Sequence, residues 1–131
     1  MREIVIMADH ETLLLLQRHA DAWNAHDAHA LLSMMTEDCV YDAAAGPAPQ
    51  GASYLGHGEL AAAFEAIWTT FPDARWDNAE HFVAGNTCFS TWVFRGTRTD
   101  GVQVDVQGLD ILRVRDGKIC HKDTYRKAVT A

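Results

Sequence analysis

Two carboxylates and one histidine lie on faces of predicted helices and strands that are otherwise apolar, where titratable side chains are rare. Asp110 lies in the stretch over residues 101–125, GVQVDVQGLDILRVRDGKICHKDTY, where valine and leucine recur at every second position. This period is typical of a β-strand with one face in the core, so Asp110 is predicted to point inward. A buried carboxyl group is costly unless it is paired or protonated. Asp110 is therefore the first candidate acid or base.

His19 and Asp42 are the other candidates. A helix is predicted over residues 10–24, because its apolar residues recur with helical spacing, and His19 shares their face. Asp42 lies in a short predicted strand, residues 39–43, on the same face as Val40. The alternation in the last strand places one further set of side chains on a single face: Ile119, His121, Asp123 and Tyr125.

The elements that must position these residues come in two runs. Helices are predicted over residues 10–24, 28–35 and 59–70, with the strand 39–43 and a Gly/Pro-rich loop between the second and third. Four antiparallel strands then follow between residues 75 and 125, joined by turns at Gly85-Asn86, Asp100-Gly101 and Asp116-Gly117. Segregated runs of this kind predict an α+β fold, with the helices on one face of a curved sheet.

Length and composition limit the remaining possibilities. The 131 residues predict one domain, residues 1–131, in which residues 1–9 form a flexible N-terminus. The net charge of −7 argues against a nucleic-acid partner. No apolar run approaches the roughly 20 residues of a membrane helix, and the N-terminal apolar stretch is too short for a secretory signal, so we expect a cytoplasmic protein without a membrane partner.

Several motifs resemble those of the SnoaL-like polyketide cyclases. They are WNAHD at residues 23–27, the strand that ends near Asp42, FPD at residues 71–73, and D-x-x-x-V-x-D-G-K-I at residues 110–119. This family is part of the nuclear-transport-factor-2-like superfamily, which also holds ketosteroid isomerase and limonene epoxide hydrolase. The resemblance implies a conical, cystatin-like barrel that encloses one pocket. It also implies a homodimer that forms through the sheet face.

The resemblance also implies functional roles for individual residues of this chain. Asp110 matches the aspartate that is the acid/base of the cyclases and also the oxyanion-hole aspartate of the isomerase. Asp42 matches the isomerase base, whereas His19 stands where the isomerase has a tyrosine. Asp123 matches a carboxylate of the epoxide hydrolase, but Gly108 stands where that enzyme has an arginine.

These residues predict a cofactor-independent enzyme acting on a small hydrophobic carbonyl or polyketide-like compound. Asp110, His19 and Asp42 would be catalytic in aldol cyclisation, isomerisation or dehydration, with Asp110 kept neutral by burial so that it donates to an enolate oxygen. All would meet in one cavity, whose predicted lining is Val40, Phe64, Trp68, Val106, Leu112, His121 and Asp123.

Other interpretations stay open. Asp110 can be a buried acid satisfied by a backbone amide or by His19, Asp42 can cap a turn, and His121 with Asp123 can be a solvated strand face. The fold can also serve as a non-catalytic binding protein or, third, as an epoxide hydrolase. Neither HxH nor HExxH spacing is present, so no metal is predicted, and the proposed chemistry needs no other cofactor.

Overall fold

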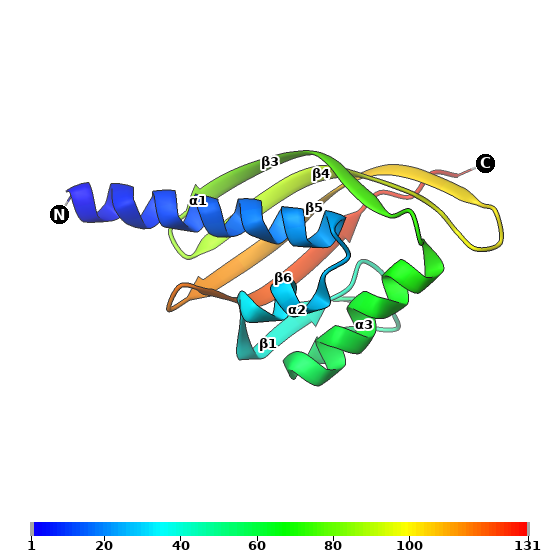
Figure 1. The fold of residues 1–131 in the computed structure, drawn as a ribbon, viewed down its shortest axis with the longest axis horizontal. Coiled ribbons are helices and arrows are strands. Elements are labelled where there is room, and N and C mark those ends of the chain that lie inside the picture. The colour runs from blue at the N-terminus through cyan, green and yellow to red at the C-terminus, as the bar shows by residue number, and fades with distance from the viewer. Residues whose placement is uncertain (1, 131) are drawn as a thin grey trace.

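The computed structural model describes the backbone of residues 2–130 and the side chains of residues 9–130. Its helices are α1 (Arg2–Asn24), α2 (Ala28–Ser33) and α3 (Gly56–Thr70), and its strands are β1 (Met35–Asp42), β2 (Ser53–Leu55), β3 (Arg75–Ala84), β4 (Thr87–Thr97), β5 (Gln103–Arg115) and β6 (Lys118–Arg126) (Figure 1). Helix α1 begins earlier than predicted. The flexibility of residues 1–9 stays a prediction, because residue 1 and the side chains of residues 2–8 lie outside the described residues.

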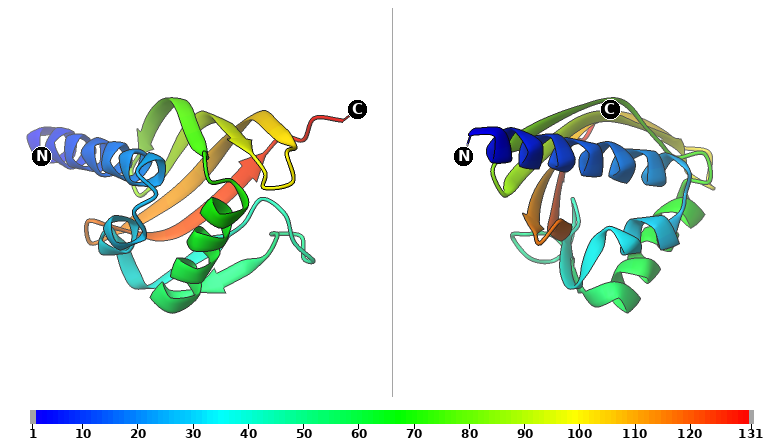
Figure 2. Two further views of the ribbon diagram at one scale, coloured as in Figure 1. Left: turned by 45° about the vertical axis from the view of Figure 1, so that its right-hand side comes forward. Right: turned by 60° about the vertical axis from the view of Figure 1, so that its left-hand side comes forward.

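The six strands form one sheet in the order β2-β1-β6-β5-β4-β3. Strands β1 and β6 pair in parallel, and the other neighbours are antiparallel. The sheet arches over the helices, with α1 on the β3 side and α3 beside β1 (Figure 2). The predicted α+β class is confirmed, with three helices on a curved, mostly antiparallel sheet. The sheet does not close, because β2 and β3 remain its two edges.

The local signals explain most element boundaries. Asp27 caps α2, and its carboxylate accepts a hydrogen bond from the Ala30 backbone N–H, as expected for an N-cap. The hairpin turns at Gly85, Gly101 and Gly117 have positive φ, which glycine adopts without steric cost. Strand β2 was missed because it is only three residues long and lies at the end of the Gly/Pro-rich loop.

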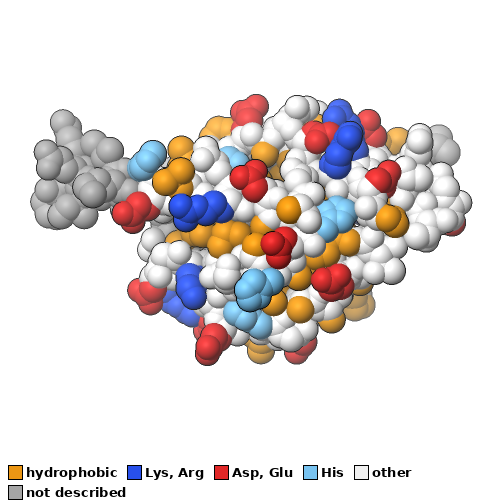
Figure 3. Space-filling model, viewed as in Figure 1, with side chains coloured by type: hydrophobic (Ala, Val, Ile, Leu, Met, Phe, Trp, Pro, Cys, Tyr) orange, Lys and Arg blue, Asp and Glu red, His pale blue; other side chains and the backbone are white. Residues whose placement is uncertain are grey.

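The core lies between the helices and the concave face of the sheet. Trp23 of α1 is its centre, because its ring centroid is 4.7 Å from that of Phe64, 5.3 Å from Trp68 and 4.9 Å from Trp76. Acidic side chains are scattered over the face that carries the helices, in keeping with the net charge (Figure 3). No helix among the described residues is long and apolar enough to cross a membrane.

A β-bulge at Cys120 decides which side chains of β6 face the core. Strand β5 pairs Val114 with Ile119 but the residue before it, Arg113, with His121, so Cys120 is an extra residue in β6. The inward and outward alternation of side chains therefore shifts by one residue after Cys120. As a result Lys122 points into the core, where His121 was expected to point. The prediction that Ile119, His121, Asp123 and Tyr125 share one face was wrong for this reason.

Candidate functional site

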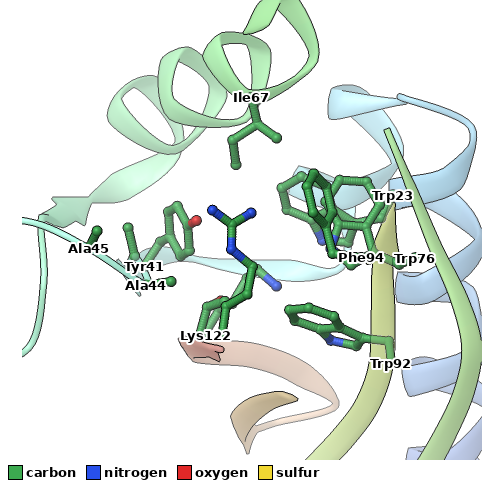
Figure 4. Close-up of a pocket in the computed structure, with 12 residues that line it drawn as sticks. Trp23, Tyr41, Ala44, Ala45, Ile67, Trp76, Trp92, Phe94 and Lys122 are labelled. Carbon is green, nitrogen blue, oxygen red and sulfur yellow. The ribbon is translucent and has the colours of Figure 1, made fainter. Parts of the chain in front are cut away.

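A cavity of about 210 Å³ lies between the helices and the sheet, and we call it the aromatic cavity (Figure 4). Its lining is Trp23, Tyr41, Ala43, Ala44, Ala45, Ile67, Trp76, Trp92, Phe94, Lys122, Thr124 and Arg126. The indole rings of Trp23, Trp76 and Trp92 supply much of the wall, and the hydroxyl group of Tyr41 points inward from the opposite side. The cavity is therefore largely aromatic, with few polar groups.

A buried ion pair lies at the base of the aromatic cavity. The Lys122 ammonium is 2.9 Å from Oδ1 of Asp110, and each side chain is only 5% exposed. The same ammonium lies over the Trp23 ring, 4.9 Å from its centroid. Because both charges are almost free of water, each depends on the other for compensation. Lys122 therefore presents a fixed positive charge to the cavity.

Besides the Lys122 ammonium, two side chains donate hydrogen bonds to the Asp110 carboxylate. The Trp92 indole N–H donates to Oδ2 at 3.1 Å, and the Thr124 hydroxyl donates to Oδ1 at 2.6 Å. Burial acts to raise the pKa of Asp110, but the Lys122 ammonium and the Thr124 hydroxyl outweigh it and hold the pKa below its ordinary value. Asp110 is thus an ionised acceptor, which corrects the expectation of a neutral acid that donates to an enolate.

His19 is buried beside this pair, as its place on the apolar face predicts. Its Nε2 accepts a hydrogen bond from the Trp23 indole N–H at 3.1 Å, which places the ring proton of neutral His19 on Nδ1. Burial, together with the nearby Lys122 ammonium, lowers the pKa of His19 to about 3. The ring is therefore neutral at physiological pH, and one of its nitrogens is already engaged. It is a poor general acid.

A small chamber of about 20 Å³ separates His19 from the aromatic cavity. Its boundary is His19, Ala20, Trp23, Trp76, Ala79, His81, Ser90, Trp92, Asp110 and Lys122. The volume has room for about one water molecule. His81 was missed by the sequence reasoning, and its Nδ1 lies 2.7 Å from the Ser90 hydroxyl. A second register shift, between Asp77 and Glu80, turns His81 toward this chamber.

Asp42, His121 and Asp123 form a separate cluster on the opposite face of the sheet. The His121 Nε2 lies 2.8 Å from Oδ2 of Asp42, and the Ser53 hydroxyl donates to Oδ1 of Asp42 at 2.6 Å. One ligand atom from each member of this cluster lies within 4.8 Å of the others, so the cluster could hold a metal ion. The predicted meeting of these residues with Asp110 and His19 in one cavity was wrong, because β1 and β6 direct them away from it.

The predicted lining needs a further correction. Phe64, Trp68, Val106 and Leu112 are all buried, but they belong to the core behind the aromatic cavity and do not line it. Val40 shares the outward face with Asp42, because Tyr41 between them is the side chain that faces inward. The polar lining instead comes from residues that the sequence reasoning did not select. They are Tyr41, Lys122, Thr124 and Arg126.

Comparison with known proteins identifies relatives of the whole fold. Residues 16–122 match the family model of the SnoaL-like domain. A protein of unknown function with an NTF2-like fold from Mesorhizobium loti is 33% identical, with coverage of 92% of this chain and 93% of that chain and a TM-score of 0.73. None of the curated proteins matches.

Two more distant structures show the same fold. A proposed polyketide cyclase from Xanthomonas campestris pv. campestris is 20% identical over 89% of this chain and 90% of its own, with a TM-score of 0.80. TerC, co-crystallised with polyporic acid, is 16% identical over 89% of this chain and 92% of its own, with a TM-score of 0.75. At these identities the likeness concerns the fold alone.

Proposed function

The chain belongs to the family of SnoaL-like domains, and from that premise we propose that it binds a small carbonyl compound in the aromatic cavity and activates the carbonyl oxygen without a cofactor. The observation that carries this proposal is the Lys122 ammonium, fixed by Asp110 at the base of an aromatic cavity. A cavity of roughly 150 Å³ accommodates benzene in another protein, so about 210 Å³ suits a single substituted ring. TerC, which has the same fold, takes up an organic compound.

The chemistry follows from where negative charge would develop. A carbonyl oxygen near Lys122 accepts a hydrogen bond from the ammonium, and the interaction strengthens as the oxygen gains charge during enolisation. One such donor contributes on the order of 10² to 10³-fold in rate. Asp110 acts as a positioning residue, because it holds the ammonium and does not line the aromatic cavity. The α-proton goes to a solvent water or hydroxide, because no carboxylate or imidazole among the described residues lines the aromatic cavity. Aldol cyclisation, isomerisation and dehydration all share the enolate that this step forms.

The Tyr41 hydroxyl is a second donor to the same oxygen. Burial raises the pKa of Tyr41, so the phenol stays protonated and able to donate. The Lys122 ammonium is 5.9 Å from the Tyr41 ring centroid, which brings both groups to one region of the cavity (Figure 4). Two donors on one oxygen resemble an oxyanion hole in their effect.

Non-catalytic binding is the second candidate, and one observation favours it. Among the described residues that line the aromatic cavity there is no carboxylate and no imidazole, so a bound ligand meets no ordinary side-chain base. Epoxide hydrolysis has no such support. Asp123 lies on the other face of the sheet, and a Cβ atom at Gly108 would lie 2.5 Å from two carbons of Trp92, which leaves no room for an arginine.

Exchange of α-protons with solvent tests the proposal without knowledge of the natural substrate. Acetophenone is incubated with the protein in D₂O, its binding is followed by tryptophan fluorescence, and deuterium entry into its methyl group is followed by proton NMR. We expect binding together with exchange above the buffer rate. A folded Lys122→Met/Asp110→Asn double variant, which lacks the ammonium but leaves no unpaired carboxylate, should lose the excess exchange.

The outcomes separate the two candidates. Binding without excess exchange would refute carbonyl activation and support the binding protein. If neither acetophenone nor cyclohexanone binds, the assignment of the aromatic cavity to a small carbonyl compound is refuted. Equal exchange by the wild type and the double variant would remove Lys122 from the mechanism.

We also propose the homodimer that the resemblance implies. Phe82 and Phe89 support it, because they are stacked with centroids 5.0 Å apart and are 42% and 39% exposed on the outer face of the sheet. Exposed paired aromatics of this kind are typical of contact surfaces. Light scattering after gel filtration should give twice the monomer mass for the wild type and a smaller mass for Phe89→Lys. A monomeric wild type would refute the dimer.

A further inference from the structure

Arg126 is a second cation of the aromatic cavity, and it differs from Lys122 in having no counterion among the described residues. Its guanidinium carbon lies 4.8 Å from the centroid of the Phe94 ring. A guanidinium stacked on an aromatic face keeps its N–H groups directed outward in the plane of the group, where they can bind a carboxylate with two hydrogen bonds. Its position in the lining places these donors within reach of a bound ligand.

The other arginines of the described chain show why this matters. Four of them form ion pairs with aspartates: Arg75, Arg95, Arg98 and Arg115. Arg18 and Arg113 have no carboxylate partner among the described side chains, but both lie outside the aromatic cavity. Among the described arginines, Arg126 alone combines an unpaired guanidinium with the cavity lining. The residue is exposed overall, but partial burial of its guanidinium lowers its pKa. A partly desolvated cation of this kind is stabilised by an anion from outside the chain.

The charge balance of the cavity leads to the same ligand. Lys122 and Arg126 are the charged groups in its lining, and Asp110 already neutralises Lys122. One positive charge is left over, although the whole chain carries a net charge of −7. A local charge opposite to the overall charge favours a ligand of complementary sign.

Both cations come from one face of strand β6, with Arg126 at its C-terminal end. Arg126 is four positions after Lys122 in β6, which corresponds to about 13 Å between their Cα atoms, and Thr124 lies between them on the same face. A ligand that meets both therefore needs a polar group at each end, with a ring between them against the indole walls.

We propose that the ligand is an aromatic-sized organic acid whose carboxylate binds Arg126 while its carbonyl oxygen lies at Lys122. This inference rests on the proposed function, since it assumes that the aromatic cavity is the binding site. It adds the substrate class, a carboxylate and a carbonyl at opposite ends of one ring, and it makes Arg126 the specificity-determining residue.

Two matched probes test it. 4-Acetylbenzoate carries a ketone and a carboxylate at opposite ends of a ring, and 4-acetylbenzamide has the same shape and ketone but no charge. Their dissociation constants are measured by tryptophan fluorescence and calorimetry. A charge-assisted, two-point contact predicts that wild type prefers the benzoate by about tenfold or more. Arg126→Gln should reduce that preference to about twofold or less, while Arg113→Gln, which removes the same charge at an exposed site, should keep it.

Each result decides between the inference and its premise. Equal affinities for the two probes in the wild type would refute the carboxylate site and leave the proposed function standing, because the shared ketone still binds. A preference that survives in Arg126→Gln would remove Arg126 as the anchor and overturn the inference. Failure of both probes and of acetophenone to bind would overturn the proposed function, and the inference with it.

Discussion

Two polar clusters lie back to back on strand β6, and they differ in almost every physical respect. The inner cluster is Lys122, Asp110 and Thr124, and the outer cluster is Asp42, His121 and Asp123. Lys122 and Asp110 are each 5% exposed at the side chain, whereas in the outer cluster Asp42 is 11% and His121 29% exposed. Neighbouring residues of one strand thus face a dry interior and a wet surface. Their sequence positions alone do not reveal which is which.

The environment of these side chains determines their chemistry more than the residue type does. His121 with Asp42 has the composition of an acid/base pair, yet water screens part of its charge and the aromatic cavity is on the other face. Lys122 with Asp110 has a fixed geometry and little water, so its charge acts strongly on a ligand. Four experiments test this contrast, and their expected effects decrease from the inner cluster to the outer one.

Removal of Lys122 should have the largest effect. Lys122→Met leaves the Asp110 carboxylate buried without its counterion, and loss of one partner of a buried pair costs about 3–5 kcal/mol in the free energy of unfolding. Urea unfolding measures this cost. Lys118→Met makes the same chemical change at the exposed end of β6 and should change the free energy by less than about 0.5 kcal/mol. Similar losses for both variants would show that the inner pair is not special.

The second prediction concerns pH and His19. Its pKa is about 3 in the folded chain, against an ordinary value of 6.5 when the chain is unfolded, so between these values the unfolded state binds a proton that the native state does not. Stability is therefore complete above pH 6.5 and falls as the pH decreases toward 3, by about 1.4 kcal/mol per pH unit within the window. The lowered pKa of Asp110 adds a loss only below its ordinary value of 3.8.

Unfolding in urea from about pH 7.5 to about pH 4.5 measures this slope, since the range covers most of the window in which His19 stays neutral only in the folded chain. His19→Gln keeps a hydrogen-bond acceptor for Trp23 but does not titrate, so its slope should be shallower than that of the wild type. His121→Gln makes the same change in the outer cluster but leaves His19 in place, so its slope of stability against pH should match that of the wild type. Parallel curves for the wild type and His19→Gln would show that His19 is not the buried titrating group.

The third prediction concerns Gly108, which lies against the Trp92 ring next to the inner cluster. A Cβ atom there would lie 2.5 Å from two Trp92 ring carbons and 2.6 Å from the Tyr125 carbonyl oxygen. Gly108→Ala must therefore displace the indole that donates to Asp110, at an expected cost of about 1–3 kcal/mol in the free energy of unfolding. Gly58→Ala, with open space around its Cβ position, is the control and should be neutral or slightly stabilising. A neutral Gly108→Ala would mean that Trp92 moves freely.

The fold could be predicted because its signals are local and consistent. Glycines at the turns, the cap at Asp27 and the period of two in β5 each specify one element, and together they leave few α+β arrangements. The burial of Asp110 and His19 follows from the same reasoning, since both lie in phase with apolar neighbours.

The site could not be predicted in the same way. One extra residue, Cys120, reverses the facing of every later residue of β6, and nothing in its side chain distinguishes a bulge from regular pairing. Lys122 was overlooked because lysine is almost never fully buried unless it is paired. Its partner Asp110 is 12 positions away, so the pair is visible only once β5 and β6 are in register.

The smallest effect is expected in the outer cluster, and it tests the contrast most directly. His121→Gln removes an imidazole that lies 2.8 Å from Asp42, but an amide can still donate to that carboxylate, and the Ser53 hydroxyl remains. A partly exposed pair contributes about 0–1 kcal/mol, so urea unfolding should detect little change, and acetophenone should bind as in the wild type. Loss of acetophenone binding by a folded His121→Gln variant would place the ligand on the outer face.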